Sequence, residues 1–333
     1  MNKQGKYKVS ELEKNLKQLL GARRRLFQLK KPIELENPIR GREEFDPKVI
    51  NKIFLISVLF GQGEEYFSFI EEIKNHKVHI FNEEFTKIIL NELDTISDFV
   101  EYLDKKEALI DTNKNFLIIG GEKELLAFYL FNNRSFDRFS NADHIIIEEG
   151  SWDRLQNKPE YIAKKKVDET SYMWDGMISR AHESSSKEYE FVARELARPN
   201  RVQRRFLAKA FLSAWIEANE SKDISSYRRI LISDNMTYCF LFQDDNDPSR
   251  EKRKDHLGTI CFIARGKCKE NKIVIGIATE KKIKETCSYD FCMLFLPEWN
   301  DELQKSAEEI QNKYKIFLKS SIHYIREEEY PEN

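Results

Sequence analysis

Apolar residues recur at helical spacing through much of the first 220 residues, beginning close to the N-terminus. Ser10 and Glu13 form a capping box, in which the serine hydroxyl accepts from a backbone N–H of the first helical turn. Four leucines then share one face of the predicted helix: Leu12, Leu16, Leu19 and Leu20. We expect this helix to end at Gly21 and a short, basic helix to follow over residues 22–31.

The next stretch mixes extended and helical patterns. Prolines at positions 32, 38 and 47 predict an extended connector. Helical spacing then predicts helices over residues 48–59 and 64–74, and farther along over 83–93, 95–110 and 122–131. Short runs rich in β-branched and aromatic residues predict strands at 78–81, 116–119 and 145–147.

The pattern changes after residue 220. Residues 160–219 are helical in pattern, whereas short apolar runs at 229–233, 237–243, 273–279 and 289–296 are typical of strands. Asp247-Pro248 and Pro297 each open an amphipathic helix between or after these strands. Residues 228–318 therefore have the order ββαββα. The fold class is α+β: a mostly helical N-terminal domain with a few short strands, followed by a ββαββα C-terminal domain.

These patterns divide the chain into four parts. We expect a basic N-terminal helix and connector over 1–47, a mainly helical domain with short strands over 48–220, the ββαββα domain over 221–320 and an acidic tail over 321–333. The length of 333 residues agrees with about two globular domains.

The composition argues against a secreted, disulfide-bonded protein and against a membrane-spanning one. The chain is 41% hydrophobic and 34% charged, and it contains five cysteines, an odd number that favours a reducing compartment over a disulfide framework. Residues 1–31 intersperse charges with leucines, so we expect no secretory signal there, and every apolar run is too short to span a membrane. These observations predict a soluble, cytoplasmic protein with no membrane partner.

The net charge of −2 hides a local imbalance. Residues 1–31 contain ten lysines and arginines against only Glu11 and Glu13, and this asymmetry is typical of proteins that bind a polyanion. Two arginine-rich segments are the candidate contacts with phosphate: Arg23, Arg24 and Arg25, and then Arg201, Arg204 and Arg205. Because three consecutive residues of a helix point about 100° apart, some of Arg23–Arg25 require a partner. The alternative is that these arginines pair with acidic residues of the same chain.

A weaker pattern points to catalysis. Either Asp244 or Asp245 follows one predicted strand, and Glu280 and Lys282 follow the next. This is the arrangement of acids and lysine in a metal-dependent phosphodiester hydrolase. The usual signatures of phosphate-binding loops, serine hydrolases and zinc sites are absent from the sequence. No cofactor is indicated, and no residues qualify as a metal site.

Three functions follow as hypotheses. The first is a nucleic-acid-associated protein that holds the phosphate backbone through its arginine-rich segments. The second is the phosphodiester hydrolase built on Asp245, Glu280 and Lys282. The third is a protein–protein interaction factor whose basic arm binds an acidic protein.

Overall fold

The chain forms an α+β fold with two compact units, Met1–Lys164 (with the last two residues) and Lys165–Pro331. The structure, a computed structural model, describes residues 9–29, 31–38, 41–61, 69–112, 115–184, 186–221, 224–233, 236–244, 250–318 and 327–331. Within those residues no helix combines the length and the apolar character needed to cross a lipid bilayer. Each unit is described below by itself.

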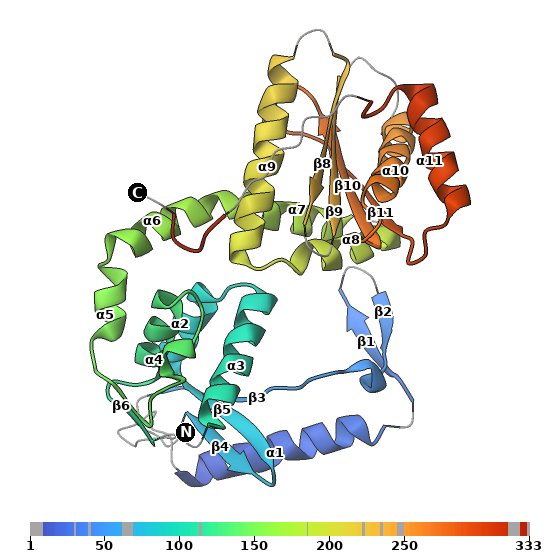
Figure 1. Cartoon of the computed structure of the whole chain (residues 1–333). Helices are drawn as coiled ribbons and strands as arrows, with labels where there is room; N and C mark the ends of the chain where they lie inside the picture. The colour runs from blue at the N-terminus through green and yellow to red at the C-terminus, as the bar shows by residue number, and fades with distance from the viewer. Residues whose placement is uncertain are drawn as a thin grey trace. The chain divides into compact units, whose positions relative to one another are not determined.

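A three-stranded sheet forms the centre of unit 1 (Figure 1). Its strands are β3 (Leu55–Leu59), β5 (His76–Asn82) and β4 (Ile70–Ile73), in the order β3-β5-β4, with β3 and β5 parallel. On one face lies α1 (Val9–Phe27), whose Leu12 and Leu16 are buried against apolar residues of β3 and β5. The opposite face carries α2 (Glu83–Glu92) and α3 (Ile96–Ile110), held by ring contacts of Phe81 with Phe85 and Phe99.

Several predicted elements of unit 1 differ from the structure. The helix that begins near Ser10 continues through Gly21, so α1 is one helix rather than two. The predictions of helices over 48–59 and 64–74 are wrong, because the described parts of these ranges contain β3 and β4. The expected connector is partly a hairpin of β1 (Ile33–Asn37) and β2 (Gly41–Phe45), followed by a 3₁₀ turn, η1 (Pro47–Val49). Strand β3 buries alternate residues, as a sheet requires.

The remainder of unit 1 follows the predicted pattern closely. Strands β6 (Asn115–Ile118) and β7 (His144–Ile147) form a parallel pair, with α4 (Glu122–Phe131) and a short η2 (Asp137–Phe139) between them. The chain then continues through α5 (Ser151–Gln156) into α6 (Pro159–Asp168). Lys106 of α3 forms a fully buried ion pair with Glu122 at the start of α4, which ties these two helices together.

A histidine is buried among basic groups in unit 1. His79 on β5 has no exposed surface, and its Nε2 lies 3.0 Å from Glu107 Oε1. Burial, together with the charges of Lys106, Lys77 and Lys52, lowers the pKa of His79 to about 3. The imidazole is therefore neutral at neutral pH, and Nε2–H donates to the Glu107 carboxylate.

Unit 2 is a four-stranded mixed sheet between helices (Figure 1). Strands β8 (Ser226–Ile232), β9 (Thr237–Gln243), β10 (Ile273–Glu280) and β11 (Asp290–Phe295) are ordered β11-β10-β9-β8, and only β9 and β10 are parallel. Helices α7 (Tyr172–Glu183), α8 (Lys187–Ala197) and α9 (Arg201–Glu220) cover one face, and η3 (Glu169–Ser171) precedes them. Helices α10 (Arg250–Lys267) and α11 (Asp301–Tyr314) lie on the other side. The predicted order ββαββα is confirmed.

Close packing of α10 on the sheet depends on one glycine. Gly276 of β10 pairs with Cys239 on one side and Cys292 on the other, and a Cβ at this position would lie 2.6 Å from Cys261 Sγ of α10. Hydrogen bonding among the three thiols and burial raise the pKa values of Cys261 and Cys292. Cys239 and Cys261 are completely buried, so these cysteines act as small core residues.

The boundary between the units lies earlier than the sequence analysis placed it. We expected the ββαββα domain to begin at residue 221, whereas unit 2 begins at Lys165. The reason is the packing of α9, where Phe211 contacts Phe240 and Phe242 of β9, with ring centroids 5.1 Å apart in each pair. Helices α7–α9 therefore share one hydrophobic core with the sheet.

Candidate functional site

The first predicted group of arginines lies at the C-terminal end of α1. Leu12 and Leu16 fix the orientation of this helix because they are buried against the sheet. Arg23 lies toward the leucine side, where its Nη1 is 3.2 Å from His76 Nε2 and its guanidinium is 5.2 Å from the ring centre of Phe27. Arg24 and Arg25 are exposed. Of the three arginines, Arg23 therefore contacts side chains of the same chain.

Two lysines extend this exposed surface along α1. At 100° per residue, Lys14, Lys17, Arg24 and Arg25 fall within an arc of about 100° that lies opposite the leucine stripe. All four side chains are exposed, and Glu11 and Glu13 flank the arc without entering it. We call these four residues the outer basic face. They form no ion pair with any residue that the structure describes.

The outer basic face was only partly identified from the sequence. Lys14 and Lys17 count among the basic residues of the first 31 positions, but the sequence pattern did not mark them as phosphate contacts. The signal was present, since residues 14, 17, 24 and 25 share a helix face once α1 continues through Gly21. The predicted break at Gly21 concealed that alignment.

The second group of arginines lies inside unit 2. Arg201 and Arg204 donate to the two oxygens of Asp175, at 2.8 and 2.7 Å. Arg204 also donates to the carbonyl oxygens of Pro199 and Ala197. Both arginines are almost completely buried, with 4% and 6% of their surface exposed. Their donors are therefore used to join α9 to α7 and to the turn that precedes α9.

Arg205 is buried even more completely. Its side chain donates to Asp168 Oδ1 at 2.9 Å, and its Nε lies 2.7 Å from Glu327 Oε1. The carbonyl oxygens of Glu328 and Glu329 accept further hydrogen bonds from the same guanidinium. The described part of the expected acidic tail is thus attached to α9. Because these three arginines are used within the fold, we do not include them among the proposed phosphate contacts.

The candidate catalytic residues do not come together as a metal site. Asp245 lies outside the described residues. Lys282 is exposed, whereas the neighbouring Lys281 is buried and donates to the carbonyl oxygen of Ile224 at 2.6 Å. No group of three or more potential metal ligands converges within the described part of the chain.

Glu280 itself is occupied by local partners. Its carboxylate accepts hydrogen bonds from the backbone N–H and the hydroxyl of Ser288, and it lies 3.3 Å from Arg253 Nη1. Burial raises its pKa, but the hydrogen bonds from Ser288 and the charge of Arg253 outweigh that effect, so the pKa is lowered. Glu280 therefore fastens residues 281–288 to the end of β10.

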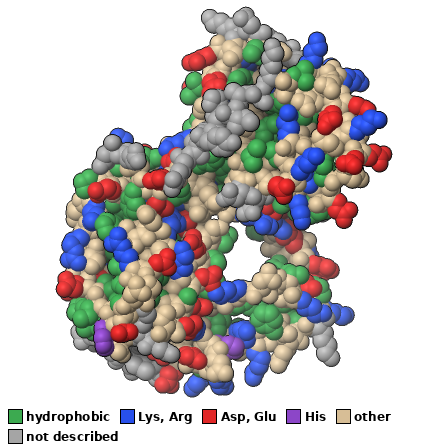
Figure 2. Space-filling view, viewed as in Figure 1, with side chains coloured by type: hydrophobic (Ala, Val, Ile, Leu, Met, Phe, Trp, Pro, Cys, Tyr) green, Lys and Arg blue, Asp and Glu red, His purple; other side chains and the backbone are tan. Residues whose placement is uncertain are grey.

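Comparison with known proteins adds no assignment. The chain matches no protein-family model, no curated protein and no solved structure. On the visible surface of both units, basic and acidic side chains are interspersed (Figure 2).

Proposed function

We propose that the protein binds nucleic acid through the phosphate backbone, with the outer basic face of α1 as its contact surface. The observation that carries this proposal is the alignment of Lys14, Lys17, Arg24 and Arg25 on one exposed arc, where none of them pairs with an acidic residue that the structure describes. Exposed lysines and arginines without internal ion pairs keep their donors available for phosphate oxygens.

The dimensions of this surface suit a polyanion. Residues 14 and 25 are separated by about 16 Å along a helix, which corresponds to about five phosphates of one strand measured along a duplex axis. The leucine stripe fixes α1 on the sheet, so the four cations are positioned before binding. Contacts of this kind position the nucleic acid and read no base sequence.

Binding of labelled duplex and single-stranded nucleic acid, measured by fluorescence anisotropy between 50 and 200 mM salt, tests the proposal. Four phosphate contacts give a log–log slope of about −3.6 on duplex DNA and about −2.8 on single strands. Replacing Lys14, Lys17, Arg24 and Arg25 by glutamine should remove most of that slope. A matched control replaces four exposed lysines of unit 2 by glutamine: Lys252, Lys254, Lys305 and Lys313.

The outcomes are distinct. A flat salt dependence in the parent chain, or an equal loss of binding in the two quadruple variants, would contradict the proposal. An acidic protein that binds the same face, with no binding of nucleic acid at 50 mM salt, would favour the interaction factor instead. The described residues give no support to the hydrolase hypothesis, because the Glu280 carboxylate is already paired with Arg253 and Ser288.

A further inference from the structure

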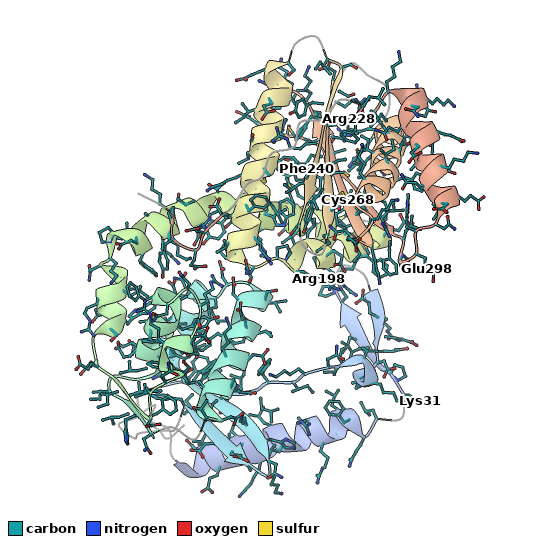
Figure 3. All side chains as sticks on the ribbon, viewed as in Figure 1. Lys31, Arg198, Arg228, Phe240, Cys268 and Glu298 are labelled. Carbon is teal, nitrogen blue, oxygen red and sulfur yellow. The ribbon has the colours of Figure 1, made fainter. Side chains whose placement is uncertain are left out.

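One arginine of unit 2 differs from the other buried arginines in its partners. Arg228 lies on β8, and Figure 3 labels it near the end of the sheet where β9 ends and α10 begins. Its Nε donates to His256 Nε2 at 3.2 Å, and its Nη2 donates to Ser226 Oγ at 2.6 Å. Both partners accept a hydrogen bond from Arg228, and no carboxylate among the described residues forms an ion pair with this guanidinium.

Other arginines of unit 2 have partners that compensate their charge better than those of Arg228 do. Arg253 lies 2.6 Å from Asp290 and Arg229 lies 2.7 Å from Glu217, so each has a carboxylate partner. Arg265 is surrounded by backbone carbonyl oxygens, including that of Leu296. A partly buried guanidinium loses solvation, and a protein recovers this loss by pairing the charge.

The environment of Arg228 is partly dehydrated. Burial lowers the pKa of Arg228, and no carboxylate among the described residues opposes that effect. The hydroxyl of Ser226 accepts from Arg228 through oxygen, which leaves its own proton available to donate. Arg228, Ser226 and His256 therefore present polar groups at one place while the arginine retains an unmatched positive charge.

The position within the topology also favours a ligand. Arg228 pairs with Leu241, two residues before the end of β9, and His256 lies in the second turn of α10. Strands β9 and β10 are parallel and α10 connects them, and ligands of such units bind beyond the carboxyl ends of the parallel strands. Among the described acidic groups near this end, Asp244 lies by Lys281, Glu280 lies by Arg253, and Asp290 pairs with Arg250 and Arg253.

From these observations, we propose that Arg228, Ser226 and His256 form a binding site for the phosphate group of a small phosphorylated molecule. The guanidinium supplies the charge and a donor at Nη1, and the serine hydroxyl supplies a second donor. This site belongs to unit 2 and stands independently of the outer basic face on α1.

Inorganic phosphate, titrated into the full chain at 20 mM ionic strength and followed by calorimetry, is the direct test. We expect saturable binding that weakens at least tenfold in Arg228→Gln and is reduced in Ser226→Ala. Arg198→Gln serves as the control, because the Arg198 side chain is 68% exposed and pairs with Glu195. A nucleoside monophosphate titrated in parallel shows whether a free phosphate or a larger phosphate ester binds more tightly.

A thermal measurement separates this role from a structural one. Because the charge of Arg228 is unmatched, Arg228→Met should leave the melting temperature without phosphate unchanged or higher, while phosphate should stabilise only the parent chain. Absence of phosphate binding to the parent at 20 mM would overturn the proposal. So would equal binding in Arg228→Gln and the parent, an equal loss in Arg198→Gln, or equal affinity for acetate.

Discussion

Two arginine-rich helices occupy opposite environments in this protein. On α1, Arg24 and Arg25 are exposed and form no ion pair with a described residue. On α9, Arg201, Arg204 and Arg205 are buried against carboxylates and carbonyl oxygens. Both segments are equally basic in sequence. The difference depends on whether distant parts of the chain bring acids to the helix, so local charge counts cannot distinguish a binding surface from an internal network.

The largest expected effect is at the centre of the α9 network. Arg205→Met removes the buried guanidinium that both Asp168 and Glu327 contact, and removing one member of a buried ion pair lowers the free energy of unfolding by about 3–5 kcal/mol. Urea unfolding followed by tryptophan fluorescence measures this, because Trp174, Trp215 and Trp299 all lie in unit 2. Arg198→Met, at an exposed position, should change stability by no more than about 0.5 kcal/mol. Equal effects of the two substitutions would erase the distinction between buried and exposed arginines.

Replacing an acidic partner of the buried arginines is a second test of whether these arginines stabilise the fold. Asp175→Asn removes the charge that both Arg201 and Arg204 contact, and it should lower the free energy of unfolding by about 1–3 kcal/mol. The carboxylate is 31% exposed, so water replaces part of the interaction. A double-mutant cycle with Arg204→Gln should show coupling, and strictly additive effects would mean that the pair contributes no interaction energy.

The free energy of unfolding of unit 1 should depend on pH, because His79 is buried near three lysines. The folded pKa of His79 is about 3, below its usual value of 6.5, so the unfolded chain binds an extra proton between those values. The contribution of His79 to the free energy of unfolding is fully present above pH 6.5. It declines as the pH falls, by about 2 kcal/mol between pH 7 and pH 5. Fluorotryptophan NMR of Trp152 during urea unfolding reports on unit 1. His79→Gln should remove this part of the pH dependence, and an unchanged pH profile would place the titrating group elsewhere.

The smallest effect on stability is expected on α1. Replacing Lys14, Lys17, Arg24 and Arg25 by glutamine breaks no ion pair among the described residues, so the free energy of unfolding should fall by only about 1 kcal/mol or less. The small loss reflects the favourable position of Arg24 and Arg25 at the C-terminal end of the helix dipole. Circular dichroism during urea unfolding checks this, and a loss of several kcal/mol would show that these cations hold the fold together.

Periodicity predicted most of the fold. The order ββαββα, strand β5 and helices α2–α4 follow directly from the spacing of apolar residues. Strand β3 was missed because the short run Leu55–Leu59, apolar except for Ser57, fits a buried strand and a helix equally well, and only its pairing with β5 decides between them. Gly21 was misinterpreted because packing of the leucine stripe outweighs the low helix propensity of one glycine.

The candidate sites were less predictable for a physical reason. Arg205 meets Asp168, 37 positions earlier, and Glu327, far later in the chain, so its burial depends on tertiary contacts. Arg228 gave no signal in sequence, since consecutive arginines on a strand point to opposite faces and only the structure shows which one meets a carboxylate. The outer basic face, by contrast, follows from helix geometry alone.

The contacts of Arg205 also bear on the topology of the chain. Asp168, near the start of unit 2, and Glu327, near its end, both ion pair with this one side chain, so the two ends of the unit lie together. Closing a short loop costs little entropy, and domains whose ends are close tolerate circular permutation. Unit 2 is therefore suited to a permuted chain in which a short linker joins residues 331 and 165 and new ends are opened at a surface connection.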